Sequence, residues 1–191
     1  MIRVVLDTNI LVSALLQPQG LPARTFLMAL AGTTAQLCVS GDIYAEYEEV
    51  IRRSKFNRSE AVIESALHAI WQNGLWVKRS EKVHACSDPD DDIFLECAQA
   101  ARAHYLVTGN QKHFPAKWAD TQIVTARQFL DAVAESQDEP KIVLEGAVIT
   151  ENLARTQSPS AGVADRGNFE ATKQGVLNRN AASAKRSSQP G

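Results

Sequence analysis

Acidic side chains recur in this chain where an apolar run ends or a helical pattern begins. Asp7 follows the apolar residues 4–6, Glu46 lies one turn into a helical pattern, and four aspartates crowd residues 88–92. A carboxylate at the end of a buried strand is costly unless it is paired, hydrogen-bonded or bound to a cation. Hard divalent cations such as Mg²⁺ and Mn²⁺ prefer such oxygen ligands. The acidic set therefore favours a metal site, to which the aspartate cluster at residues 88–92 contributes as a whole.

Each acidic position also has an ordinary structural explanation. Asp7 can cap the helix that follows it, and Asp88 or Asp90 can cap the helix after the cluster. One or two carboxylates would satisfy a capping role, whereas four raise a repulsion that a cation would relieve. Glu46 taken alone is almost as readily one of several glutamates on a solvated helix face.

Polar residues with neutral or basic side chains follow the apolar run 105–107. Their oxygens offer further ligands, the glycine permits close backbone approach, and the basic groups can meet phosphate. The residues are Thr108, Gly109, Asn110, Lys112 and His113. The alternative is that these residues form an ordinary polar loop anchored by Phe114. For His113 we favour this alternative and expect its ring to lie at the surface.

Short apolar runs alternate with longer helical patterns from the start of the chain to residue 134. This alternation predicts parallel strands joined by crossover helices, that is, a three-layer α/β/α sandwich with a central parallel sheet. The expected strands are 2–6, 36–40, 75–78, 105–108 and 122–125. The expected helices are 10–16, 21–31, 42–53, 59–73, 91–103 and 126–134.

The composition predicts one globular domain, residues 1–134, followed by a disordered polar tail, residues 135–191. The 191 residues are 45% hydrophobic and carry a net charge of -2. Because this charge creates no strong field for polyanions, any nucleic-acid substrate would depend on metal ions and local cations. The nearest candidates for such cations are Arg3, Arg24, Arg52, Arg53 and Lys112.

Cysteine usage and hydropathy indicate the compartment. The three cysteines show neither metal-ligand nor disulfide spacing, which fits a reducing environment. No apolar run approaches the roughly 20 residues that cross a bilayer. We therefore expect a cytoplasmic protein that does not span a membrane.

Taken together and in order, these motifs resemble the PIN domain family. The segments that carry the resemblance are Leu-Asp-Thr-Asn at 6–9, Glu46, Asp-Asp-Asp-Ile-Phe-Leu-Glu-Cys-Ala at 90–98, Tyr-Leu-Val-Thr-Gly-Asn at 105–110 and His-Phe-Pro at 113–115. The resemblance covers residues 1–134 and is nearest to the branch assigned as toxins of toxin–antitoxin systems, VapC-like ribonucleases. It does not extend to the tail.

The resemblance implies a parallel sheet flanked by helices and an RNA-cleaving activity that depends on Mg²⁺ or Mn²⁺. It implies three catalytic acids, namely Asp7, Glu46 and Asp92, with Asp91 and Asp88 as rivals for the third position. Asn110 stands where many relatives carry a fourth aspartate. Since an amide brings no charge, one metal ion is expected rather than two.

Further roles follow from the same resemblance. The metal ligands would be oriented by neighbouring polar groups, for which the candidates are Thr8, Asn9, Thr108 and Asn110. Lys112 would contact the RNA backbone. A small antitoxin would block the acidic site, and the protein would form a homodimer.

Two other classes of function fit part of the pattern. A metal-dependent phosphatase with Asp7 as nucleophile would carry a second aspartate two residues on, where this chain has Asn9. Alternatively, the neutral Asn110 is compatible with a PIN scaffold of weak or no catalytic activity that only binds RNA or a protein.

Overall fold

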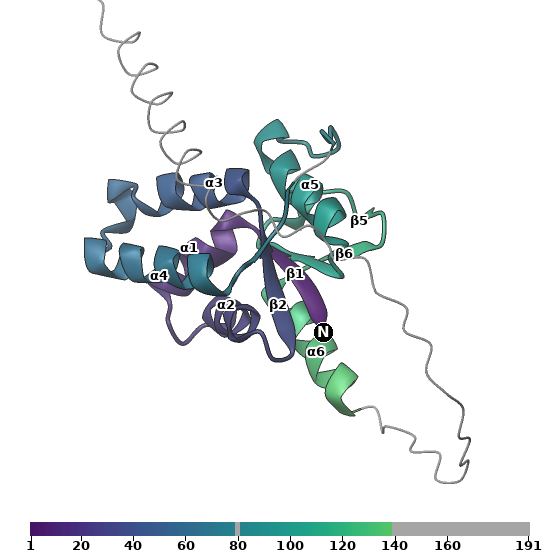
Figure 1. Ribbon diagram of the computed structural model, residues 1–191, viewed down its shortest axis with the longest axis horizontal. Coiled ribbons are helices and arrows are strands. Elements are labelled where there is room, and N and C mark those ends of the chain that lie inside the picture. The colour runs from purple at the N-terminus through teal and green to yellow at the C-terminus, as the bar shows by residue number, and fades with distance from the viewer. Residues whose placement is uncertain (79–80, 139–191) are drawn as a thin grey trace, which may run out of the picture.

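The computed structural model describes residues 1–78 and 81–138, which form a six-stranded sheet with helices packed against it (Figure 1). The strand order is β3-β2-β1-β4-β6-β5. The strands are β1 (Ile2–Leu6), β2 (Ala35–Val39), β3 (Leu75–Trp76), β4 (Tyr105–Val107), β5 (Lys117–Trp118) and β6 (Thr121–Val124). All neighbouring pairs are parallel except β5 with β6, which is antiparallel.

The central strand β1 is buried on both faces. Val4, Val5 and Leu6 are each at most 1% exposed, as expected for a parallel strand covered by helices on both sides. Leu6 pairs with Val107 of β4, and the ladder continues one residue further, because the Asp7 amide donates to the Val107 carbonyl at 2.9 Å. Asp7 therefore emerges from the sheet beside the end of β4.

One or two helices join each pair of successive strands from β1 to β4, and a last helix follows β6. The helices are α1 (Thr8–Leu16), α2 (Leu21–Ala31), α3 (Gly41–Ile51), α4 (Glu60–Asn73), α5 (Asp92–Ala101) and α6 (Ala126–Asp138). Three short 3-10 turns, η1 (Ser54–Phe56), η2 (Pro89–Asp91) and η3 (Gln111–His113), lie between them. Helix α2 packs against β2, α5 against β1 and β2, and α6 against β4 and β6. The predicted three-layer α/β/α fold is confirmed.

Aromatic side chains anchor the loop that follows β4. Phe114 is 7% exposed and meets the fully buried Phe94 of α5 edge to face, with ring centroids 6.4 Å apart. Such a pair stabilises the contact beyond its buried area. Because the anchor fixes the chain directly after η3, the polar residues of that turn are held at a defined place.

Some details of the sequence prediction differ from the structure. The sheet is mixed rather than wholly parallel, because residues 117–118 form an antiparallel edge strand that was not expected. Helix α5 begins one residue later than predicted, after η2, and α6 continues to Asp138. Of the tail predicted for residues 135–191, positions 139–191 lie outside the described residues. In the described part of the chain, no helix is long and apolar enough to cross a membrane.

Candidate active site

Asp7 lies at the carboxyl end of β1 and begins α1. Its side chain is held by three hydrogen bonds: Oδ1 accepts from the Asn9 amide at 3.1 Å, and Oδ2 accepts from Asn9 Nδ2 at 2.5 Å and from Thr108 Oγ1 at 2.6 Å. The residue is only 5% exposed. Burial raises the pKa of this carboxyl, and the hydrogen bonds from Thr108 and Asn9 oppose that rise. Asp7 therefore both caps α1 and presents an oriented carboxylate at the edge of the sheet.

The loops after β1 and β4 are tied together around this carboxylate. Asn9 Oδ1 accepts from the Gly109 amide at 2.8 Å, and Thr108 Oγ1 accepts from the Asn110 amide at 2.9 Å. A Cβ at Gly109 would lie 3.1 Å from Asn9 Oδ1, so this close approach depends on the glycine. Asn9 and Thr108, both predicted to orient a ligand, thus contact Asp7 directly, whereas Asn110 acts on it through Thr108.

Glu46 belongs to the same site rather than to a solvated helix face. It lies on α3, whose first turn is capped by Ser40, and its Oε1 accepts from Thr8 Oγ1 at 2.7 Å. The pKa of Glu46 is raised to about 7, mainly by burial and in addition by the charges of Asp7, Asp91 and Asp90, while the Thr8 hydrogen bond opposes the rise. The carboxylates at these positions therefore act on one another.

The aspartates of the cluster have different roles: one caps a turn, and another belongs to the acidic site. Asp88 caps η2, since its Oδ1 accepts from the Asp90 amide at 3.2 Å. Asp91 is half-buried, and burial raises its pKa, which the hydrogen bond with His113 lowers and the charge of Asp88 raises. The charge of Asp91 raises in turn the pKa of both Asp7 and Glu46.

Asp92, expected from the family resemblance to be the third acid, has a different environment. It is 5% exposed, and its Oδ1 accepts from the backbone amides of Ala85 at 3.0 Å and Cys86 at 2.9 Å. Burial would raise the pKa of this carboxyl, but the two amide hydrogen bonds hold it below its usual value. Asp92 thus fixes the loop that precedes η2, while its rival Asp91 lies within reach of the charges of Asp7 and Glu46. We therefore place Asp91 ahead of Asp92 in the proposal below.

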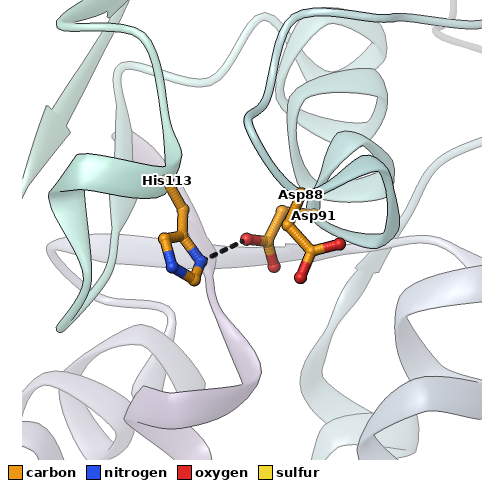
Figure 2. Close-up of side chains that lie close together, drawn as sticks. All are labelled: Asp88, Asp91 and His113. Atoms are coloured by element: carbon orange, nitrogen blue, oxygen red, sulfur yellow. Dashed lines mark hydrogen bonds and ion pairs between the residues drawn. The ribbon is translucent and has the colours of Figure 1, made fainter.

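His113 reaches the cluster from η3 (Figure 2). Its Nδ1 lies 3.0 Å from Asp91 Oδ2, and its Nε2 lies 2.7 Å from Asn110 Nδ2. Its imidazole and the carboxylates of Asp88 and Asp91 each offer one ligand atom, and these atoms all lie within 4.8 Å of one another. The prediction that His113 is a simple surface imidazole missed this contact. One signal was present in the sequence: His113 follows Asn110 by three residues, which is one 3-10 turn and brings the two side chains to the same face.

The cations proposed for an RNA backbone are mostly engaged elsewhere. Arg52 pairs with three glutamates of α3 and α4, and Arg53, which follows α3, pairs with Glu49 of that helix. Arg3 donates to the Ala101 carbonyl at the amino end of the sheet strands, away from Asp7. Lys112 is exposed on η3 beside His113. Arg24 is exposed on α2. Among these cations, Lys112 is the one next in sequence to a residue, His113, that contacts the aspartate cluster.

Asp7, Glu46 and Asp91 supply oxygen donors of the kind that a hard divalent cation takes, and in the described residues the group whose ligand atoms lie within 4.8 Å of one another is Asp88, Asp91 and His113. Asp7, Glu46 and Asp91 come from three segments of the chain, and all three have raised pKa values. Within residues 1–78 and 81–138, neither Asp7 nor Glu46 forms an ion pair with a lysine, arginine or histidine. These carboxylates repel one another, and no cationic side chain neutralises Asp7 or Glu46 in the described residues. Mg²⁺ and Mn²⁺ bind carboxylate oxygens of this kind.

Comparison with known proteins agrees with this geometry. No curated protein matches the chain. The model of one family, described as the PIN domain, matches residues 3–112, which run from β1 to η3 and include Asp7, Glu46, Asp91 and Thr108. PIN domains are typically metal-dependent nucleases. Since the match spans more than half of the sequence, the chain belongs to the PIN domain family.

Proposed function

We propose that this protein is an endoribonuclease that uses Mg²⁺ or Mn²⁺ to hydrolyse phosphodiester bonds of RNA. One observation carries the proposal: Asp7, held by Thr108 at the carboxyl end of β1, and Glu46, held by Thr8, gather at one edge of the sheet, where the charge of Asp91 raises the pKa of both. A cation is the group that would turn this repulsion into attraction. Membership of a family of nucleases supports the reaction class.

The side chains have distinct tasks in this proposal. Asp7 and Asp91 hold the cation, and Glu46 either completes the ligand set through water or orients the attacking water. A bound divalent cation would supply a coordinated water of lowered pKa and positive charge opposite the phosphoryl oxygens. Thr8 and Thr108 keep two of the carboxylates in place by the hydrogen bonds that they donate to Glu46 and Asp7.

RNA binding depends on local rather than overall charge. The net charge of -2 provides no general attraction for a polyanion. We assign to Lys112 a contact with the phosphate backbone, because it is exposed on the turn that also carries His113. Replacement of Lys112 by Gln is expected to weaken RNA binding and to reduce its salt dependence.

The finer assignment is that the nuclease is the toxin of a toxin–antitoxin pair, acts in the cytoplasm as a homodimer and is blocked by a small antitoxin. It rests on the resemblance of the acidic motifs to that branch of the family. Its test is induced expression of the wild-type chain and of Asp7→Asn in a bacterial host. Growth arrest by the wild type alone supports the assignment, and normal growth with active nuclease contradicts it.

The nuclease proposal itself is tested by incubating the purified full chain with a mixed pool of single-stranded RNA. The reactions contain Mn²⁺ or EDTA, and Asp7→Asn is compared with Asp131→Asn, which changes an exposed aspartate of α6. We expect cleavage that needs Mn²⁺, is lost in Asp7→Asn and is retained in Asp131→Asn. Equal cleavage by both variants would overturn the assignment. Absence of both cleavage and metal binding in a folded protein would instead favour the non-catalytic binding module.

A phosphatase mechanism is disfavoured by the side chain of residue 9. Such an enzyme places a second carboxylate there as a proton donor, but Asn9 donates its amide to Asp7 and accepts from Gly109. Both ends of that amide are thus used to position the loops. Trapping of a phosphorylated Asp7 would be needed to restore this alternative.

A further inference from the structure

We infer that His113 supplies a nitrogen ligand to the cation held by Asp91, and thereby makes the site select Mn²⁺ over Mg²⁺. The inference rests on the proposed function for the presence of a cation in the site. It adds His113, a residue of η3, to the carboxylates that hold the cation in the proposed function.

The position of the ring is the first argument. Figure 2 shows the imidazole of His113 facing the carboxylates of Asp88 and Asp91 from the opposite loop. The side chain of Asp91 is 19% exposed and that of His113 is 36% exposed, so the pair lies at the rim of the site, where ions and water can enter. The ring nitrogen that faces Asp91 is Nδ1, at 3.0 Å from Oδ2.

The ring is held by one contact at its second nitrogen, and the backbone that carries it is held by another. Asn110 lies 2.7 Å from Nε2, and the backbone carbonyl of His113 accepts from the Ser87 amide at 2.9 Å. Metal-bound histidines characteristically use their second ring nitrogen for such a hydrogen bond. With a cation at Nδ1, the Nε2–H group would donate to the carboxamide oxygen of Asn110, which requires only that the amide be turned over.

The distances allow one ion to be shared. Ligands of a small divalent cation lie about 2.1 Å from it, so that two of them are at most about 4.2 Å apart. The ligand atoms of Asp88, Asp91 and His113 are within 4.8 Å of one another, and small side-chain rotations close the difference. Asp91 is the carboxylate common to this group and to the electrostatic set with Asp7 and Glu46.

The nature of the donor decides the selectivity. Mg²⁺ takes oxygen ligands and retains its water. Mn²⁺ also takes oxygen ligands, but as a first-row transition metal it accepts an imidazole nitrogen more readily than Mg²⁺ does. A site built only from carboxylates and amide oxygens accepts either ion. One nitrogen therefore shifts the preference to Mn²⁺ without any change in the net charge of the ligands.

The inference is tested on the Mn²⁺-loaded full chain by pulsed electron paramagnetic resonance, which detects a nitrogen bound to Mn²⁺. The variant is His113→Gln, which leaves the backbone contact with Ser87 in place, and the matched control is His68→Gln, at an exposed position of α4. We expect the nitrogen signal in the wild type and in His68→Gln, and its loss in His113→Gln. Calorimetric titration is expected to show that His113→Gln loses about tenfold or more in Mn²⁺ affinity and less than about twofold in Mg²⁺ affinity.

Several results would overturn the inference. Bound Mn²⁺ without a nitrogen signal, or a signal that persists in His113→Gln, excludes His113 as a ligand. An equal loss of Mn²⁺ and Mg²⁺ affinity means that the ring only orients Asp91. Folded wild-type protein that binds no Mn²⁺ at millimolar concentration also contradicts it. The RNA-cleavage comparison of wild type with Asp7→Asn is a separate measurement, so a nuclease without nitrogen ligation contradicts this inference alone.

Discussion

The hydroxyl of Thr108 donates a hydrogen bond of 2.6 Å to Asp7 Oδ2, across 101 positions of sequence. The same hydroxyl accepts from the Asn110 amide, so it joins the carboxylate at the end of β1 to the loop that carries His113. Thr108 is completely buried. The orientation of the Asp7 carboxylate therefore depends on the residue that follows the neighbouring strand β4, and not only on helix α1, which Asp7 caps.

Replacement of Thr108 by Val should weaken metal binding while preserving side-chain shape. Valine removes the donor to a buried carboxylate, which costs about 1–3 kcal/mol of folding stability. Mn²⁺ affinity should fall about tenfold, since an orienting group of a ligand is lost. Calorimetric titration and urea unfolding measure the two effects. Thr108→Ser, which keeps the hydroxyl, serves as the control, and unchanged Mn²⁺ affinity in Thr108→Val would show that the hydrogen bond does not orient the ligand.

Asp91 and Asp92 should respond in opposite ways to substitution. Asp91→Asn is expected to lose most Mn²⁺ binding with little loss of stability, because it removes one of several repelling charges. Asp92→Ala is expected to lose about 2 kcal/mol or more of unfolding free energy, because the amides of Ala85 and Cys86 lose their acceptor. The measurements are metal titration and chemical unfolding of each variant. The reverse pattern would make Asp92 the third acid of the site.

The stability of the metal-free protein should fall as the pH rises from about 4.5 to about 7. The pKa of Glu46 is raised from 4.5 to about 7, so in this range the folded state binds more protons than the unfolded state, and deprotonation favours unfolding. The raised pKa values of Asp7 and Asp91 act in the same direction. Thermal unfolding in EDTA as a function of pH measures the effect. Glu46→Gln should show a shallower decline, and a decline equal to that of the wild type would mean that Glu46 does not carry it.

Added Mn²⁺ should reverse this loss near neutral pH. A ligand that binds only the folded state stabilises it by about 2.7 kcal/mol at a concentration of 100 Kd. The midpoint of thermal unfolding should therefore rise with Mn²⁺ at pH 7.5 in the wild type, and much less in Asp7→Asn. Equal shifts in the two proteins would place the bound ion elsewhere.

The elements that position the site could largely be predicted from sequence, because their signals are local. The bounds of β1 and α2 agree with the apolar run and the helical pattern that predicted them. The two-residue strand β5 could not be predicted, since its pairing with β6 at the sheet edge leaves no alternation of apolar and polar residues to detect.

The residues of the candidate site were harder to predict where two candidates are neighbours in the sequence. Asp91 and Asp92 stand at the junction of a 3-10 turn and an α-helix, whose residues advance by different angles about the axis. Sequence spacing therefore did not determine which of the two carboxylates acts on the pKa of Asp7. The contact of His113 with Asp91 depends in the same way on two loops that meet only in the folded chain.

The central place of β1 in the sheet has a consequence for synthesis. Among the strands of this sheet, β1 is translated before the others, yet it has neighbours on both sides, and one of them, β4, ends at Val107. A nascent chain that stops before Tyr105 already contains every acid of the proposed site but has no Thr108 to hold Asp7. Assembly of the site must therefore wait until most of the domain has been translated, and a prematurely terminated product would be unable to form it.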